Sequence, residues 1–94
     1  MAAEPIARAK EVRDDGSIVE IVIWRVDQPL RPCTHPFKYR LYFGRHGVCR
    51  VRYDNERGKG DHCHISGRER SYEFVSLAKL PDDFQHDVET WREP

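Results

Sequence analysis

The stretch FKYRLYFGRHGVCRVRY, residues 37–53, decides the fold, because two alternating segments flank a short turn. Every second residue from 37 to 43 is apolar, which is typical of a strand with one buried face. Segment 48–53 returns after the glycine-containing turn and completes an antiparallel hairpin. We predict a three-residue loop, residues 45–47, because this register gathers the apolar side chains on one face. The predicted pairs are Gly44 with Val48, Phe43 with Cys49, Leu41 with Val51 and Tyr39 with Tyr53.

The same register predicts a basic second face on this hairpin. It places Tyr42 opposite Arg50, Arg40 opposite Arg52 and Lys38 opposite Asp54. Because like charges directly opposite one another are mildly destabilising, such a patch needs a reason. One reason is a phosphate-bearing ligand whose bases stack on the tyrosine ring. The alternative is a solvated face that is neutralised by carboxylates from elsewhere, for example from the acidic carboxyl end.

The flanking segments indicate an α+β fold. Segment 17–26 is a β-branched, apolar strand, 27–36 is a proline-rich loop, and 71–76 is a short strand. Apolar residues then recur at helical spacing up to Trp91. Ser76 is a suitable N-cap, but Pro81 favours a separate turn at 76–80 and a main helix from Pro81 onward. We expect one small domain, residues 1–94: an irregular segment 1–15, an antiparallel sheet of four or five strands within 17–75, and a helix within 76–92 on one face.

The composition of the chain argues against a disulfide-rich, secreted or membrane protein. The chain has 94 residues, of which 38% are hydrophobic, and its three cysteines do not form a disulfide framework. No signal peptide or membrane span is visible, so we expect a cytoplasmic protein with no membrane association. The net charge of zero hides a basic middle, since residues 31–70 hold ten Lys/Arg against four Asp/Glu. Residues 71–94 hold two against six. The middle segment is therefore a candidate surface for an anionic ligand.

The polar stretch YDNERGKGDHCHISGRE, residues 53–69, holds the candidate chemistry, and we interpret it as a loop. His62 and His64 are two residues apart, so in an extended segment both point to the same side and Cys63 points to the other. Two histidines do not complete a zinc site, and Asp54, Asp61, His35 or His46 would have to join them. We therefore predict no metal and no other cofactor. A histidine pair suits acid–base chemistry, and the alternative is a pair of surface histidines in a flexible loop.

These observations define two sets of candidate residues. The proposed catalytic set is His62, His64, Asp54 and Lys59, and the proposed nucleic-acid-binding set is Lys38, Arg40, Tyr42, Arg50, Arg52, Arg57 and Arg68. Together they favour metal-independent cleavage of RNA, in which a histidine activates a 2′-hydroxyl and cations hold the phosphate. The main alternative is a non-enzymatic module that binds a protein or a nucleic acid. Asp54 and Asn55 also have a structural interpretation, as a turn-capping pair at the end of a strand.

The run VRYDNERGKGDHCHISGRE, followed by YEFVSLAKLPDDFQHDVE, resembles the TumE family of small bacterial and archaeal proteins. In that family an R-Y-D-N strand end precedes a polar loop that closes on H-x-H, and then a short aromatic-containing strand and a terminal helix. Tyr53, Asp54, Asn55, His62 and His64 stand at the matching positions, over a resemblance that extends from about residue 37 to 91. The cysteine between the two histidines departs from the polar residue usual there.

The resemblance implies the toxin half of a type II toxin–antitoxin pair. It implies growth inhibition, a cytoplasmic location and a cognate antitoxin encoded beside it, often a helix-turn-helix DNA-binding protein. It is compatible with a homodimer and with RNA as a target. It assigns no catalytic residues, so the roles of the histidines depend on the residue chemistry given above.

Overall fold

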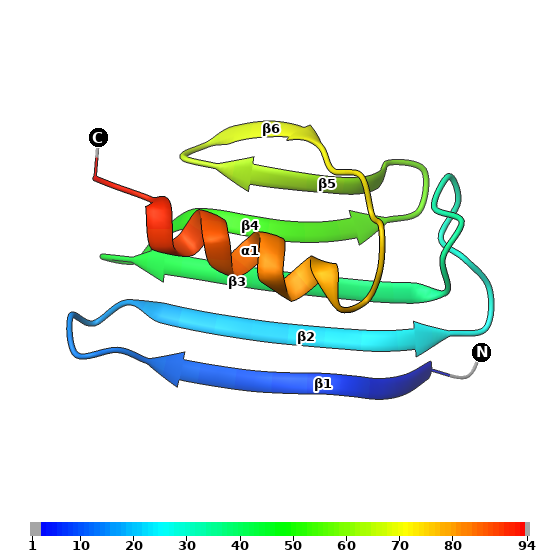
Figure 1. Cartoon of the computed structure of the whole chain (residues 1–94), viewed down its shortest axis with the longest axis horizontal. Coiled ribbons are helices and arrows are strands. Elements are labelled where there is room, and N and C mark those ends of the chain that lie inside the picture. Colours follow the sequence, from blue (N-terminus) through cyan, green and yellow to red (C-terminus); the bar gives the residue numbers. More distant parts are fainter. Residues whose placement is uncertain (1–2, 94) are drawn as a thin grey trace.

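A computed structural model describes residues 3–93 as a six-stranded antiparallel sheet with one helix. The strands are β1 (Ala3–Val12), β2 (Ile18–Val26), β3 (Phe37–Arg45), β4 (Val48–Glu56), β5 (Gly60–Ile65) and β6 (Arg68–Ser71), and the helix is α1 (Lys79–Thr90). Strand order follows the sequence, and α1 lies across β3 and β4 on one face of the sheet (Figure 1). The predicted α+β class with a carboxyl-terminal helix is confirmed, but the prediction of four or five strands is wrong.

One of the unexpected strands is β1, in the segment that was expected to be irregular up to residue 15. Its residues are almost all exposed, and only Ala7 is partly buried against the core. Its own sequence therefore contributes little apolar burial. Its backbone pairs with β2 from Ala3–Val26 to Val12–Ile18. β1 forms because the long apolar β2 presents a free row of backbone donors and acceptors, a cause that lies outside the segment itself.

The polar stretch 53–69 is not a loop. It completes β4, forms all of β5 and begins β6, with tight turns that use positive φ at Gly58 (86°) and Gly67 (81°). The predicted strand at 71–76 is also wrong, because β6 ends at Ser71 and the chain then leaves the sheet toward α1. Alternation still holds within the stretch: Cys63 is buried toward α1, and the histidines on either side of it point the other way.

The predicted register of the β3–β4 hairpin is wrong by one residue next to the turn and by two residues beyond the bulge. The turn contains two residues, His46 and Gly47, whose φ angles of 56° and 72° suit the twist of a hairpin. A bulge opposite Gly44 then absorbs Arg50 as the extra residue. The observed pairs are Arg45 with Val48, Gly44 with Cys49, Phe43 with Val51, Tyr42 with Arg52, Leu41 with Tyr53 and Arg40 with Asp54. The bulge keeps the apolar residues on one face, which is why hydrophobic matching alone did not distinguish the two registers.

The core lies between this apolar face and α1. Its buried members include Tyr39, Leu41, Phe43, Val51, Tyr53, Cys63, Leu80, Phe84, Val88 and Trp91. The helix begins two residues before Pro81, and the proline lies in the first turn, where a missing N–H breaks no helical hydrogen bond. The Ser76 hydroxyl accepts a hydrogen bond from the Lys79 N–H at 3.1 Å, but the N-cap residue is Ala78. The predictions of Ser76 as the N-cap and of a helix start at Pro81 are therefore wrong. Within residues 3–93, no helix is long and apolar enough to cross a membrane.

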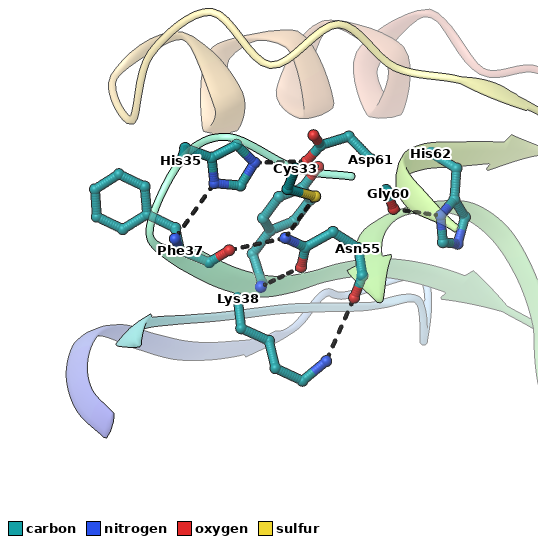
Figure 2. Close-up of polar contacts among 9 residues, drawn as sticks. Cys33, His35, Phe37, Lys38, Asn55, Gly60, Asp61 and His62 are labelled. Atoms are coloured by element: carbon teal, nitrogen blue, oxygen red, sulfur yellow. Dashed lines mark hydrogen bonds and ion pairs between the residues drawn. The ribbon is translucent and has the colours of Figure 1, made fainter. Parts of the chain in front are cut away.

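Asn55 connects the loop before β3 to the end of β4, and it is not part of a turn cap. Its side chain is 2% exposed. Its Oδ1 accepts the backbone N–H of Tyr39 at 3.0 Å, and its Nδ2 donates to the carbonyl of Phe37 at 2.8 Å and toward Cys33 Sγ at 3.7 Å (Figure 2). These contacts replace the backbone ladder where the pairing of β3 with β4 has ended.

We predict that Asn55→Ala lowers the free energy of unfolding by about 2 to 4 kcal/mol, because it leaves a buried backbone donor and a buried acceptor without partners. Urea denaturation followed by tryptophan fluorescence measures this change. Gln28→Ala, which alters an exposed side chain of the loop before β3, should change stability by less than about 0.5 kcal/mol. Equal stability of Asn55→Ala and the wild type would contradict the assigned role.

Candidate functional site

The candidate residues meet on the face of the sheet that points away from α1, which we name the open face. Because opposite residues of an antiparallel sheet share a face, the strand pairs define two rows across it. One row contains Arg8, Val22, Arg40, Asp54, His62 and Ser71, and the next contains Lys10, Glu20, Tyr42, Arg52, His64 and Glu69. The two histidines therefore lie side by side, at the β5 end of two rows that begin with cations on β1.

His62 is held between two oxygen atoms. Its Nδ1 lies 3.1 Å from the carbonyl oxygen of Gly60, and its Nε2 lies 2.6 Å from Asp54 Oδ1. The distance between Nε2 and Asp54 Oδ1 is short, but Oδ1 has no hydrogen bond of acceptable alignment among the described residues. The two groups are therefore in contact without an aligned hydrogen bond, and Nε2 is directed away from Oδ1.

The ring of His64 is more exposed to solvent than the ring of His62. Its side chain is 21% exposed, compared with 6% for His62, and the two ring centroids are 5.5 Å apart in an edge-to-face arrangement. Burial, and then the positive charge of Arg52, lower the pKa of His64 below the value of a free imidazole. Its Nε2 is buried without a hydrogen bond among the described residues, and the nearest carboxylate oxygen, on Glu69, is 3.8 Å away. His64 is thus the neutral imidazole of the pair near pH 7.

Lys59 and Arg52 supply the charges beside the histidines. Lys59 forms an ion pair with Glu69, the carboxylate next to His64. Arg52 Nε lies 3.3 Å from Asp54 Oδ2, so the Asp54 carboxylate is shared by a guanidinium and an imidazole. All four residues of the predicted catalytic set therefore lie at the β4–β5 end of the open face.

The predicted nucleic-acid-binding set is only partly gathered on that face. Lys38, Arg40, Tyr42 and Arg52 are on it, but the predicted oppositions of Arg40 with Arg52 and of Lys38 with Asp54 are wrong. Arg40 lies opposite Asp54, so two cations no longer face each other. Lys38 instead lies opposite Trp24 on β2, and its Nζ donates to the carbonyl of Asn55 at 3.3 Å.

The other three cations of that set lie elsewhere. The bulge turns Arg50 to the α1 side, where its guanidinium lies 5.1 Å from the ring centroid of Trp91 and 3.6 Å from Glu93. Glu93 of the carboxyl end thus neutralises Arg50 on the α1 side, and this contact does not involve the open face. Arg57 is exposed in the β4–β5 turn. Arg68 pairs with Ile65, which faces the core side.

Three candidate ligand-contacting residues of the open face were not predicted from the sequence. Arg8 and Lys10 reach it through β1, a strand that was not predicted, and Trp24 reaches it through β2. The alternation of Arg8 and Lys10 with alanines at residues 7 and 9 was the available signal. It is a weak one, since alanine contributes little to either face.

Two groups of side chains have donor atoms close enough to consider a metal ion. In each group, Asp54–His62–His64 and Cys33–His35–Asp61, the three candidate atoms lie within 4.8 Å of one another. Zinc bonds of 2.0–2.1 Å in a tetrahedron separate the ligand atoms by about 3.3 Å. In both groups two ligands are already closer, with His62–Asp54 at 2.6 Å and His35–Asp61 at 2.8 Å. Both groups are therefore more tightly spaced than the ligands of a shared zinc ion.

The second of these groups anchors the loop before β3 on the α1 side (Figure 2). His35 stacks on Phe74 with ring centroids 3.8 Å apart, and Asp61 accepts a hydrogen bond from the hydroxyl of Tyr39 at 2.6 Å. Burial raises the pKa of the Cys33 thiol, so this cysteine is not an activated nucleophile. The group explains why Asp61 and His62, although adjacent in sequence, have different roles on opposite faces.

Comparison with known proteins agrees with the resemblance described above. A family model described as "Toxin TumE" matches residues 2–92. The match includes β1 and β2, which the motif from residue 37 onward did not cover. No curated protein and no solved structure gives a significant match.

We predict that Arg52→Ala raises the pKa of His64, because it removes a positive charge that disfavours the imidazolium. The pKa should stay below that of a free imidazole, since burial is the larger cause of the shift. NMR titration of the histidine ring signals measures the change. Arg57→Ala, in the β4–β5 turn, is the matched control and should leave the His64 titration in place. An unchanged His64 titration in Arg52→Ala would refute the coupling.

Proposed function

This chain belongs to the TumE toxin family, and from that premise we propose that it arrests growth by metal-independent cleavage of RNA on the open face. The family indicates a toxin component of a toxin–antitoxin system. The observation that supports the chemistry is the pair of histidines beside Asp54 and Arg52. The lowered pKa of His64 leaves that imidazole free to accept a proton, and His62 beside it is the candidate proton donor, which is the division of roles that an acid–base reaction requires.

The proposed reaction needs no group beyond the chain and its substrate. His64 accepts the proton of a ribose 2′-hydroxyl, and the 2′-oxygen forms a bond to the adjacent phosphorus. The bond from phosphorus to the 5′-oxygen breaks, and His62 donates a proton to that oxygen. The products are a 2′,3′-cyclic phosphate and a 5′-hydroxyl, so atoms and charge balance.

The neighbouring groups have supporting roles in this proposal. Asp54 lies beside Nε2 of His62, and its position off the N–H direction leaves a proton on that nitrogen free to be donated. Arg52 and Lys59 place positive charge near the scissile phosphate as its negative charge increases. Arg40 and Lys38 lie farther along the open face on β3, where they would contact the RNA backbone on one side of the cut.

Membership of the family also implies an antitoxin. We propose that it is a helix-turn-helix DNA-binding protein encoded beside this chain, and that it neutralises the toxin by covering the open face. Expression of this chain with and without the adjacent gene tests the pair. Growth arrest that the neighbour relieves supports the proposal, and arrest that the neighbour does not affect contradicts it.

We predict that His64→Ala and His62→Ala each lower the rate of RNA cleavage by roughly 100-fold or more, because each removes one proton-transfer group. The measurement is cleavage of a labelled single-stranded RNA, with the 2′,3′-cyclic phosphate identified by mass spectrometry. His86→Ala, on the exposed side of α1, is the matched control and should retain full activity. Undiminished growth arrest by the double variant would exclude the acid–base mechanism.

We also predict the acid limb of the pH–rate profile. A base must be unprotonated to act, so the rate falls as the pH drops through the pKa of His64. Because that pKa is lowered, cleavage should persist at pH values where an ordinary histidine base is already protonated. Rates measured from pH 4.5 to 8 with a chelator present test this expectation. A rate that already falls at pH values above the pKa of a free imidazole would contradict the assignment of His64 as the base.

A further inference from the structure

Trp24 is an aromatic side chain on the open face that the acid–base reaction does not use. It lies on β2, opposite Lys38 of β3 and Pro5 of β1. Ile23, its neighbour in sequence, faces the core and is 3% exposed, whereas Trp24 is half-buried on the other side. Among residues 3–93, no aromatic ring or cation stacks on the indole of Trp24. The core therefore does not explain why a tryptophan stands here.

Cations surround this ring on the same face. Lys38 is its direct cross-strand neighbour, and Arg8 and Arg40 belong to the adjacent row. Neither Arg8 nor Arg40 forms an ion pair within residues 3–93. On strands β1 to β4 the open face carries five cations, Arg8, Lys10, Lys38, Arg40 and Arg52, against three carboxylates, Glu20, Asp54 and Glu56. An anionic partner therefore complements the face, although the whole chain is neutral.

A second ring, that of Tyr42, lies on the same surface. A Cβ atom at Gly44 would overlap the Tyr42 ring, so this glycine leaves the space in which the ring lies along the strand. The guanidinium of Arg40 is 5.1 Å from the ring centroid. The open face thus combines two aromatic rings with unpaired cations, which is the composition of a platform that binds unpaired bases and their phosphates together.

Cations lie on the open face between Trp24 and the two histidines. Trp24 is on β2 and the histidines are on β5, three steps across the sheet, which corresponds to about 14 Å at the usual strand spacing. Arg40 and Arg52 lie on the strands between them. A single strand could place a base on Trp24 and its backbone along these cations toward the histidines. A duplex would keep its bases stacked inside and could not use the indole.

We propose that Trp24 is a base-stacking subsite for single-stranded RNA, at the far end of the open face from His62 and His64. The proposal rests on the function proposed above in so far as this RNA is also the substrate that is cut. It adds a substrate class, an unpaired strand. It also adds a specificity element, a stacked nucleotide a fixed distance from the cleaved bond.

The test measures binding without cleavage. A single-stranded 2′-O-methyl RNA of ten nucleotides cannot be cut by the proposed reaction, because its 2′-oxygen carries no proton. The chain has two tryptophans, and Trp91 is 9% exposed on the α1 side, with Nε1 donating to Ser66 Oγ at 3.0 Å. In a Trp91→Phe protein the fluorescence reports Trp24 alone. We expect this signal to be quenched as the oligonucleotide is added.

Substitutions make the same test quantitative. Trp24→Ala should weaken binding of this oligonucleotide by about 5- to 150-fold, the range expected for losing one stacked base. Trp24→Phe should retain most of the affinity. Arg40→Glu should weaken binding and reduce its salt dependence, whereas Arg25→Glu, at the next position on β2 but beside Phe37 on the core side, should change it little. Thermal unfolding of each variant confirms that it is folded.

Each further outcome decides between the proposals. Unquenched Trp24 fluorescence, equal affinity of Trp24→Ala and wild type, or equal affinity for a duplex of the same sequence overturns the subsite. Loss of antitoxin binding in Trp24→Ala with unchanged RNA binding also overturns it and makes the face a protein interface. Trp24-dependent binding of the 2′-O-methyl RNA, together with a failure to cut the unmodified strand, supports the subsite and refutes the cleavage function. Cleavage with an unchanged KM in Trp24→Ala supports the function and refutes the subsite.

Discussion

The register of β4 against its two neighbours is the constraint on which the rest of the site depends. A one-residue bulge opposite Gly44 turns Arg50 toward Trp91 and places Asp54 opposite Arg40 on one side and His62 on the other. Without the bulge, a strand shifted by one residue would exchange its faces and separate the carboxylate from the histidines. The alignment of acid, base and cation therefore depends on the geometry of a two-residue turn that contains none of them.

The second determinant is the sharing of charge across β4 and β5. Asp54 contacts both Arg52 and His62, and the positive charge of Arg52 in turn helps to keep His64 neutral. Two histidines two residues apart would otherwise be nearly equivalent. Their different partners make them unequal, because His62 lies between a carboxylate and a carbonyl oxygen, whereas burial and a guanidinium lower the pKa of His64. This inequality is what makes an acid–base assignment possible.

The two faces of the sheet have different roles: one face stabilises the fold, and the other carries the proposed function. The α1 side carries the aromatic core, the Asn55 contacts and the Cys33–His35–Asp61 group, which together hold the loop before β3. No helix of residues 3–93 covers the open face, which presents cations, aromatic rings and the histidine pair. Asp61 and His62 illustrate the difference, because these adjacent residues of β5 make their polar contacts on opposite faces of the sheet. Substitutions on the two faces can therefore separate loss of stability from loss of RNA binding.

The sequence by itself determined the fold class, the apolar face of β3 and β4, the approximate position of the terminal helix and the shared direction of His62 and His64. These follow from the two-residue and 3.6-residue periods of side chains, which are local properties. Only the tertiary structure decided that β1 forms, that Arg50 lies on the α1 side, and that Arg40 lies opposite Asp54. β1 forms through backbone pairing with β2, which does not depend on its side chains. A bulge shifts the register but preserves the hydrophobic pattern. Neither feature can therefore be recognised from the pattern of apolar residues. The open face could be assembled only once all six strands were in place, because its residues come from every one of them.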